Sequence, residues 1–194
     1  MSNLPVVDTA GIARRHGPAL LALARESIRH GLTHRASPDI APDDFPADLR
    51  QPLATFVTLL IAANLRGCVG SLEGTRALVV DVAQNAYAAA FADPRFAPLK
   101  SQELSLLDLH ISVLSPPQPM TFHSEDELVQ QLRPGIDGLI LEENGRRGTF
   151  LPSVWERLAH PQEFLQQLKR KTGLPEDYWS PTLRVKRYTC QLIS

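Results

Sequence analysis

Cysteine is scarce in this chain, and so are other features that would assign it to a class of protein. Only two of the 194 residues are cysteines, Cys68 and Cys190, too few for a disulfide-stabilised secreted domain or a Cys-rich zinc site. The formal net charge is only −1, which gives no general reason to expect nucleic acid or an anionic membrane as a partner. No apolar run approaches the roughly 18 residues of a membrane span.

Motifs for cofactors, metals and export are missing as well. No Gly-x-Gly-x-x-Gly or phosphate-loop sequence occurs, so a nucleotide cofactor has no support. The six histidines are dispersed without metal-ligand spacing, and we expect neither a metal nor any other cofactor. The stretch Met1–Pro5 lacks the basic and apolar regions of a signal peptide. These absences predict a cytoplasmic protein with reduced thiols.

Hydrophobic residues make up 43% of the chain, enough to form a substantial core. A length of 194 residues fits one domain, and we interpret residues 1–194 as a single domain with two lobes. Gly17-Pro18 predicts the start of a first helix, and Gly31 its end. Four prolines between residues 32 and 52 exclude a long regular element there. We expect a surface excursion, more readily a structural wrap than a functional lid.

The remaining elements follow from periodicity and turn residues. The longest helix is expected at 76–92, a short helix after the capping box of Ser124 and Glu127, and another from Pro161 to Gly173. A second capping box, Ser153 with Glu156, is also predicted. Asn144-Gly145 predicts a tight hairpin turn. Strands are expected at about 53–61, 65–72, 106–114, 138–143, 147–151 and 182–192.

In the last of these strands the apolar alternation changes phase near Lys186-Arg187, as a β-bulge would cause. Residues 53–114 and 137–193 also share one order of elements: strand, turn, Arg-Gly, strand, helix, strand. The pattern predicts an α+β fold with a mixed or antiparallel sheet and packed helices. It leaves open an internal duplication of this strand-strand-helix-strand unit, with strands of both halves in one sheet.

The residues with the most chemical potential lie in the stretch Leu65–Gly70. Gly67 and Gly70 flank Cys68 closely and let a ligand approach the backbone, while Arg66 supplies a positive charge. Cys68 is a candidate nucleophile if a cation stabilises its thiolate, and a small buried hydrophobe otherwise. On a regular strand Arg66 would share a face with Cys68, whereas a bulge would separate them.

The other candidates are weighed in the same way. Arg66 either binds a carboxylate or phosphate or pairs with an acid such as Glu73. Asn85 is expected to face inward, where it caps a loop or touches a ligand. Thr149 is the counterpart of Cys68 in the second half. Asp93 and Arg95 are expected to secure the chain where it leaves the long helix.

Several of these motifs together resemble the AMMECR-type domain. They are Leu65-Arg66-Gly67-Cys68-Val69-Gly70, Asp93-Pro94-Arg95-Phe96, Pro134-Gly135-Ile136-Asp137-Gly138 and Arg147-Gly148-Thr149-Phe150-Leu151-Pro152. The resemblance runs from roughly Leu20 to Leu192, and its one departure in the central motif is Val69, where isoleucine is commoner. It implies a two-lobed α+β fold. It also implies association with a Memo-type protein and a radical SAM enzyme, as in the bacterial AmmeMemoRadiSam system.

The family has no established reaction, so two classes of function are open. In the first, the chain is an enzyme or enzyme component, with Cys68 as a covalent or thiolate group and Arg66 orienting an anionic substrate. In the second, it is a non-catalytic binding or adaptor module whose groove receives a partner peptide or carrier. No acid and base are paired near Cys68 in the sequence, which favours the second, but distant residues converge in folds.

Overall fold

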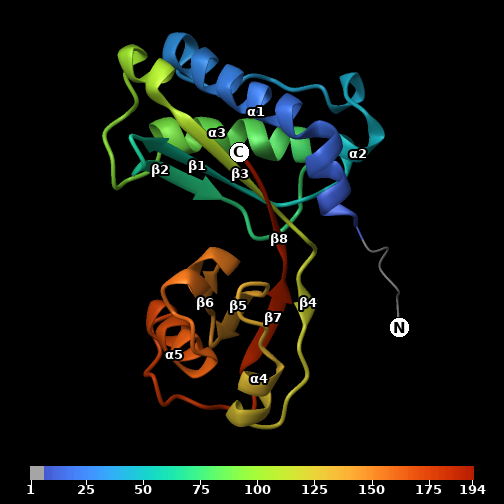
Figure 1. Cartoon of the computed structure of the whole chain (residues 1–194), viewed down its shortest axis with the longest axis vertical. Helices are drawn as coiled ribbons and strands as arrows, with labels where there is room; N and C mark the ends of the chain where they lie inside the picture. Colours follow the sequence, from blue (N-terminus) through green and yellow to red (C-terminus); the bar gives the residue numbers. More distant parts are fainter. Residues whose placement is uncertain (1–6) are drawn as a thin grey trace. The chain divides into compact units, whose positions relative to one another are not determined.

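The computed structural model describes residues 7–194, which divide into two compact units. The first unit runs to Pro116 and includes Gln191–Ser194, and the second is Pro117–Cys190. Each unit has its own four-stranded sheet and its own helices (Figure 1). The expectation for Met1–Pro5 lies outside the described residues. Within residues 7–194, no helix has both the length and the apolar character needed to cross a bilayer.

The sheet of the first unit has the strand order β2-β1-β3-β8. Strand β1 pairs antiparallel with both β2 and β3. Helices α1 and α3 cover one face, and the core forms between them and the sheet. The bounds of the strands are β1 Thr55–Ile61, β2 Asn64–Gly70, β3 Asp108–Leu114 and β8 Cys190–Ile193.

Helix α1, Thr9–His34, is longer than predicted at both ends. Asp8 is its N-cap, accepting a hydrogen bond of 2.7 Å from the backbone N–H of Gly11. Pro18 therefore lies inside the helix, where it removes one backbone donor but leaves the buried stripe of α1 intact. Gly31 does not end the helix, which closes instead at Arg35, a residue in the left-handed conformation.

The proline-rich segment begins after α1 and contains only short elements. These are the 3-10 helix η1, Pro42–Asp44, and the single-turn helix α2, Ala47–Arg50. The absence of a long regular element is confirmed from residue 35 onward, whereas residues 32–34 belong to α1. Leu49 is buried in the core of the first unit, so the segment is anchored to the body at α2.

The helix predicted at 76–92 is present as α3, Leu78–Phe91, but it is not the longest, because α1 has 26 residues and α3 has 14. Helix α3 packs closely on the β1–β2 hairpin. A Cβ atom on Gly67 would collide with the carbonyl oxygen of Ala89 in α3. Glycine in the strand is therefore needed for this approach. A 3-10 helix, η2 (Ser101–Leu106), then leads the chain back to β3.

The second unit has the strand order β4-β7-β5-β6, and all three pairs are antiparallel. Its core lies between one sheet face and helices α4 and α5, with Trp155 stacked on Phe164. Ser124 caps α4 as predicted, but Ser153 starts no capping box, because η3 has no side-chain cap. The bounds are β4 Gln118–Pro119, α4 Glu125–Gln131, β5 Gly138–Glu143, β6 Arg146–Phe150, η3 Pro152–Glu156, α5 Pro161–Lys171 and β7 Arg184–Tyr188.

Two predictions about the sheets are corrected. The two halves do not share one sheet, because each unit forms a four-stranded sheet of its own. The final strand is also not one strand with a bulge: β7 ends at Tyr188 in the second sheet, and β8 starts at Cys190 in the first. The phase change in the apolar pattern therefore marks the passage of the chain from one core to another. A register shift of the kind that a bulge causes lies instead between Leu59 and Leu60.

The repeat is retained in topology. Strand order β2-β1-β3 corresponds to β6-β5-β7, and the register pairs Leu59 with Gly67 and Leu141 with Gly148. A Cβ on Gly148 would collide with Thr172 at the end of α5, as one on Gly67 would with α3. The glycines are therefore equivalent, but the arginines before them are not.

The strand register explains why Arg66 and Arg147 are not equivalent. Arg66 has no cross-strand partner, since it is the extra residue where the register shifts between Leu65 and Gly67. Arg147 instead pairs regularly with Glu142. In each sheet the fourth strand comes from the other half of the repeat. Strand β4 follows β3 in the sequence but pairs with β7, and β8 follows β7 but lies beside β3.

Both hairpins turn through two residues with positive φ. Asn144-Gly145 confirms the predicted turn, with φ of 48° and 75°. The equivalent residues in the first unit are Ala62 and Ala63, with φ of 49° and 63°. Alanine has no side-chain hydrogen bond to offset the cost of this conformation, so the first hairpin is held by the pairing of its strands.

We expect the double substitution Ala62→Asn and Ala63→Gly to raise the free energy of unfolding by about 1 kcal/mol, because Asn-Gly favours this turn. Urea denaturation monitored by circular dichroism measures the change. The matched control is Gly145→Ala in the second hairpin, which should lower stability by a similar amount. Equal or lower stability of the Asn-Gly variant would contradict the assignment of strain to Ala62-Ala63.

Candidate functional site

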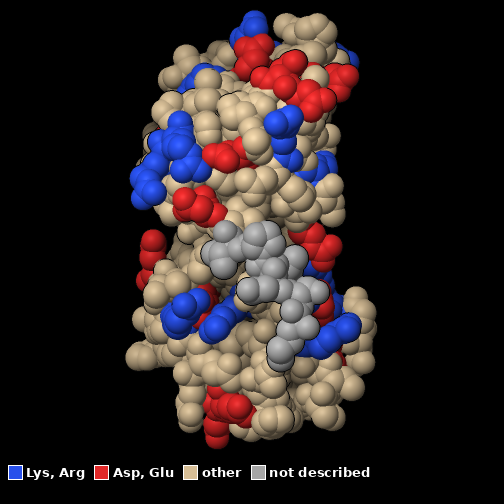
Figure 2. Space-filling view, turned by 90° about the vertical axis from the view of Figure 1, so that its right-hand side faces the viewer, with Lys and Arg blue, Asp and Glu red and all other residues tan. Residues whose placement is uncertain are grey.

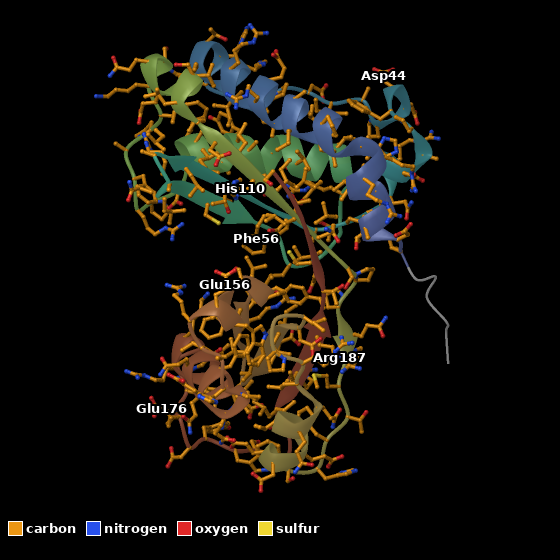
Figure 3. The ribbon with its side chains drawn as sticks, in the orientation of Figure 1. Asp44, Phe56, His110, Glu156, Glu176 and Arg187 are labelled. Atoms are coloured by element: carbon orange, nitrogen blue, oxygen red, sulfur yellow. The ribbon has the colours of Figure 1, made fainter. Side chains whose placement is uncertain are left out.

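Three chemically versatile side chains form one row across the first sheet. Thr58 of β1 is directly opposite Cys68 of β2 and His110 of β3. Residues opposite one another in an antiparallel sheet project from the same face. Since the alternate residues Leu59 and Gly67 face the helices, the row lies on the face away from α1 and α3. Figure 3 shows His110 on that face.

The Cys68 thiol is partly exposed and has a hydroxyl donor beside it. Thr58 Oγ1 lies 3.3 Å from Cys68 Sγ, within hydrogen-bond distance for sulfur. The His110 side chain is 28% exposed, and its Nε2 lies 3.2 Å from Asp108 Oδ2. The sequence indicated His110 only as one of six dispersed histidines. The register of β1 with β2 and β3 places residues 58, 68 and 110 in one row. No local sequence pattern encodes that register.

The peptide of Cys68 is clamped by the residues that follow α3. Cys68 N–H donates to Asp93 Oδ2 at 2.9 Å, and Arg95 Nη2 donates to the Cys68 carbonyl oxygen at 3.2 Å. Arg95 also pairs with Asp93 at 2.7 Å. Asp93 and Arg95 thus satisfy the free edge of β2 at Cys68.

This clamp also brings a cation to the thiol. Hydrogen bonding by Arg95, followed by the Cys68 backbone N–H, holds the pKa of Asp93 well below its usual range despite burial. The pKa of Arg95 is raised, chiefly by hydrogen bonding to Asp93 and to a smaller extent by its interaction with Cys68. The cation that senses Cys68 is therefore Arg95, which sequence reasoning treated as structural.

The Arg66 side chain forms an ion pair with an acid that the sequence did not suggest. Its Nε and Nη2 donate to Glu103 at 2.7 and 3.1 Å, so the expected partner Glu73 is replaced by a residue of η2. This pairing raises the pKa of Arg66 and lowers that of Glu103. The Arg66 side chain is only 16% exposed, and its Nη1 is buried without an acceptor in residues 7–194.

That unsatisfied donor belongs to a residue that lines a cavity of about 440 Å³. Phe96, Lys100, Gln102 and Glu103 also line it, so two cationic side chains, an amide and the carboxylate paired with Arg66 surround one space. A buried donor without a partner is costly. The guanidinium of Arg66 and the ammonium of Lys100 are groups that recognise carboxylate and phosphate oxygens.

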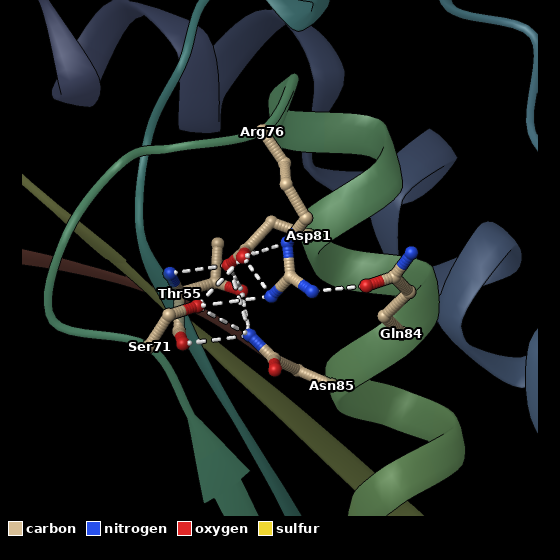
Figure 4. A network of polar contacts seen from close by, with 6 residues as sticks. All are labelled: Thr55, Ser71, Arg76, Asp81, Gln84 and Asn85. Atoms are coloured by element: carbon tan, nitrogen blue, oxygen red, sulfur yellow. Dashed lines mark hydrogen bonds and ion pairs between the residues drawn. The ribbon is translucent and has the colours of Figure 1, made fainter.

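Asn85 takes part in a buried network centred on Asp81 (Figure 4). Asp81 is 1% exposed and accepts hydrogen bonds from the Thr55 backbone and hydroxyl, from Ser71 Oγ at 2.6 Å and from Arg76 Nη2 at 2.6 Å. Asn85 Nδ2 donates to Thr55 O at 3.0 Å and to Ser71 Oγ at 3.1 Å. The network joins the start of β1, the end of β2 and the first turn of α3, so Asn85 stabilises the fold.

The remaining predicted residues are explained by their neighbours. The Phe56 ring packs over Gly70, where a Cβ would collide with it. Thr149, in the second unit, bonds through Oγ1 to Leu139 O at 2.7 Å and to the Tyr188 hydroxyl at 2.8 Å. Lys171 donates to the Thr149 carbonyl at 2.9 Å, as Arg95 does to that of Cys68. Burial raises the pKa of Tyr188.

Charge and metal-binding potential are modest. On the face that Figure 2 shows, acidic and basic side chains are interspersed without a large area of one sign. Among residues 7–194, no group of three or more His, Cys, Asp and Glu side chains is arranged to hold a metal ion. The candidate site therefore consists of Cys68 with Thr58, His110 and Arg95, and of the neighbouring Arg66 cavity.

The two units and this site define an α+β protein of the AMMECR class. The sequence model of the AMMECR1 family matches residues 21–193, and the chain belongs to that family. A protein of Methanothermobacter thermautotrophicus is 38% identical over 190 residues, covering 94% of this chain and 96% of that protein. One of Thermofilum pendens is 33% identical and covers 93% and 90%.

A solved structure agrees with the fold. The crystal structure of uncharacterized protein PH0010 from Pyrococcus horikoshii has a TM-score of 0.81 to this chain at 33% identity, covering 91% of this chain and 89% of that one. The family resemblance and the α+β class are thus confirmed. The comparisons name no reaction.

We expect Asp81→Ala to lower the free energy of unfolding by about 3–5 kcal/mol, because it leaves Arg76 and several buried donors without their acceptor. Urea denaturation measures the loss. Asp48→Ala, which removes a surface ion pair with Arg15, is the matched control and should change stability little. A loss no greater than that of the control would mean that the network is not needed for folding.

The Asp93 clamp predicts a pH dependence. The pKa of Asp93 is lower in the folded chain than the value of about 3.9 in an unfolded one, so the unfolded state binds the proton first as pH falls. The stability contributed by Asp93 is therefore fully present above about pH 4 and is lost below it. The difference in unfolding free energy between wild type and Asp93→Asn should shrink between pH 6 and pH 3. A constant difference would contradict the clamp.

Proposed function

We propose that this AMMECR1-family protein is a component of a modification pathway with Memo-type and radical SAM partners. In this proposal the groove around Cys68 and the arginines binds or acts on an anionic small molecule or carrier. The pathway and partners rest on the family resemblance. The chemical part rests on one observation, the contacts of Thr58 and Arg95 with Cys68, with His110 in the same row of side chains.

This arrangement favours a reactive thiolate. A thiolate is stabilised by a hydrogen-bond donor and by a nearby cation, and Cys68 has Thr58 and Arg95 in these roles. His110 is two strand spacings away, roughly 10 Å between Cα atoms at about 4.8 Å per spacing. Its imidazole is therefore suited to exchange a proton with a ligand lying over Thr58, rather than with the sulfur itself.

The positive charges favour an anionic ligand. The Arg95 side chain is 55% exposed, so its guanidinium has surface left for a ligand beyond its pairing with Asp93. Arg66 and Lys100 both line the cavity beside the same strand. A phosphate or carboxylate near β2 would thus meet the cationic side chains of Arg66 and Arg95, which precede and follow Cys68 in the sequence.

The alternative is a non-catalytic binding or adaptor module. It is favoured by the internal pairing of both arginines, Arg66 with Glu103 and Arg95 with Asp93. In that case the same side chains stabilise the edge of β2, and the face of the sheet receives a partner peptide or carrier. Cys68 is then a packing residue with no enhanced reactivity.

Alkylation of the native protein distinguishes the two. We expect Cys68 to react faster than Cys190, and to favour anionic iodoacetate over neutral iodoacetamide more strongly than Cys190 does, because Arg95 attracts the anion. Arg95→Gln should reduce that preference, and Thr58→Val should slow both reagents. Site-resolved mass spectrometry over pH 6–9 measures the rates. If Cys68 stays inert until the chain unfolds, the thiolate role is wrong and the adaptor role replaces it.

A further inference from the structure

A second cavity of the first unit lies between the C-terminal ends of α1 and α3 and has a composition of its own. Its volume is about 400 Å³, which falls within the range of small-molecule sites. Aromatic and aliphatic side chains form most of its wall, and one residue is cationic. The lining residues are Gly31, Leu32, Arg35, Tyr87, Phe91, Pro98 and Leu99.

The aromatic wall is held in a defined arrangement. The rings of Tyr87 and Phe91 are 5.1 Å apart and tilted by 42°. Both approach Gly31 so closely that a Cβ atom there would collide with the Phe91 ring. The Tyr87 hydroxyl donates to the Arg35 carbonyl oxygen at 2.7 Å, which fixes the ring relative to the end of α1.

Arg35 is an unusual choice at its position. It ends α1 with φ of 53° and ψ of 30°, a left-handed conformation for which glycine is the ordinary residue. Its guanidinium donates to no acceptor within residues 7–194, although its backbone is held at both ends by Gly31 and Tyr87. An exposed arginine in a strained conformation thus lines an apolar cavity, and such strain is typical of functional positions.

We propose that this cavity binds a small aromatic or similarly apolar carboxylate, with its apolar body against Tyr87, Phe91 and Leu99 and its anionic group on Arg35. The apolar body gains by leaving water, and the carboxylate is recognised by the planar guanidinium. The site is separate from the Cys68 face and does not depend on the function proposed there.

Naphthalene-2-carboxylate is a suitable probe, with naphthalene-2-carboxamide as its uncharged counterpart. Titration of the full chain, followed by amide chemical shifts, should show saturable binding with changes at Gly31, Leu32 and Leu99. The carboxamide should bind about tenfold more weakly, because it lacks the charge that Arg35 recognises. Cys68→Ser should leave the affinity unchanged, which separates this proposal from that for the thiol.

The sharpest variant is Arg35→Gly. Glycine relieves the left-handed strain, so the thermal midpoint should rise by about 2–4 °C while affinity for the carboxylate falls about tenfold. Arg29→Ala removes an exposed arginine of the same helix outside the cavity, and should leave the affinity unchanged. The proposal is overturned if acid and amide bind equally, if the shifts fall elsewhere, if the carboxylate does not saturate at millimolar concentrations, or if Arg35→Gly binds as tightly as wild type.

Discussion

The close seating of helix α3 on the β1–β2 hairpin is the constraint on which the first unit depends. Two contacts along the helix and one just beyond its end enforce it. At the N-terminal end, Asp81 collects donors from both strands, and near the C-terminal end Gly67 lets the Ala89 carbonyl approach. Beyond the helix, Asp93 binds the backbone of Cys68. Helix α3 therefore determines the position of β2, and with it the position of the thiol.

The same seating accounts for the roles of two arginines. Gly67 must face α3, so Cys68 faces the other side of the sheet, beside Thr58 and His110. The register shift between Leu59 and Leu60 leaves Arg66 unpaired in the ladder, and its side chain reaches Glu103. Arg95 is brought to Cys68 because Asp93 binds the same peptide. The arginine nearest to the cysteine in the sequence, Arg66, is thus not the one that binds the cysteine's backbone.

The second unit repeats the constraint with different chemistry. Gly148 lets the end of α5 approach β6, and Lys171 holds the carbonyl of Thr149 as Arg95 holds that of Cys68. Yet a threonine replaces the cysteine, and it is bonded to Tyr188 and to Leu139. One copy of the motif therefore has only packing and hydrogen-bonding roles, while the other retains a partly exposed thiol. The comparison isolates Cys68, Thr58 and His110 as the features that the repeat alone does not require.

The sequence by itself determined the α+β class, the family, a helix at about 76–92, the Asn144-Gly145 turn and the order of elements in each half. These depend on periodicity and turn residues, which are local. Only the tertiary structure decided that α1 continues through Pro18, and that the last strand divides between two sheets. It alone paired Arg66 with Glu103 and aligned His110 with Cys68. Such contacts join residues some 40 positions apart through strand register and helix packing, and no local pattern of side chains specifies them.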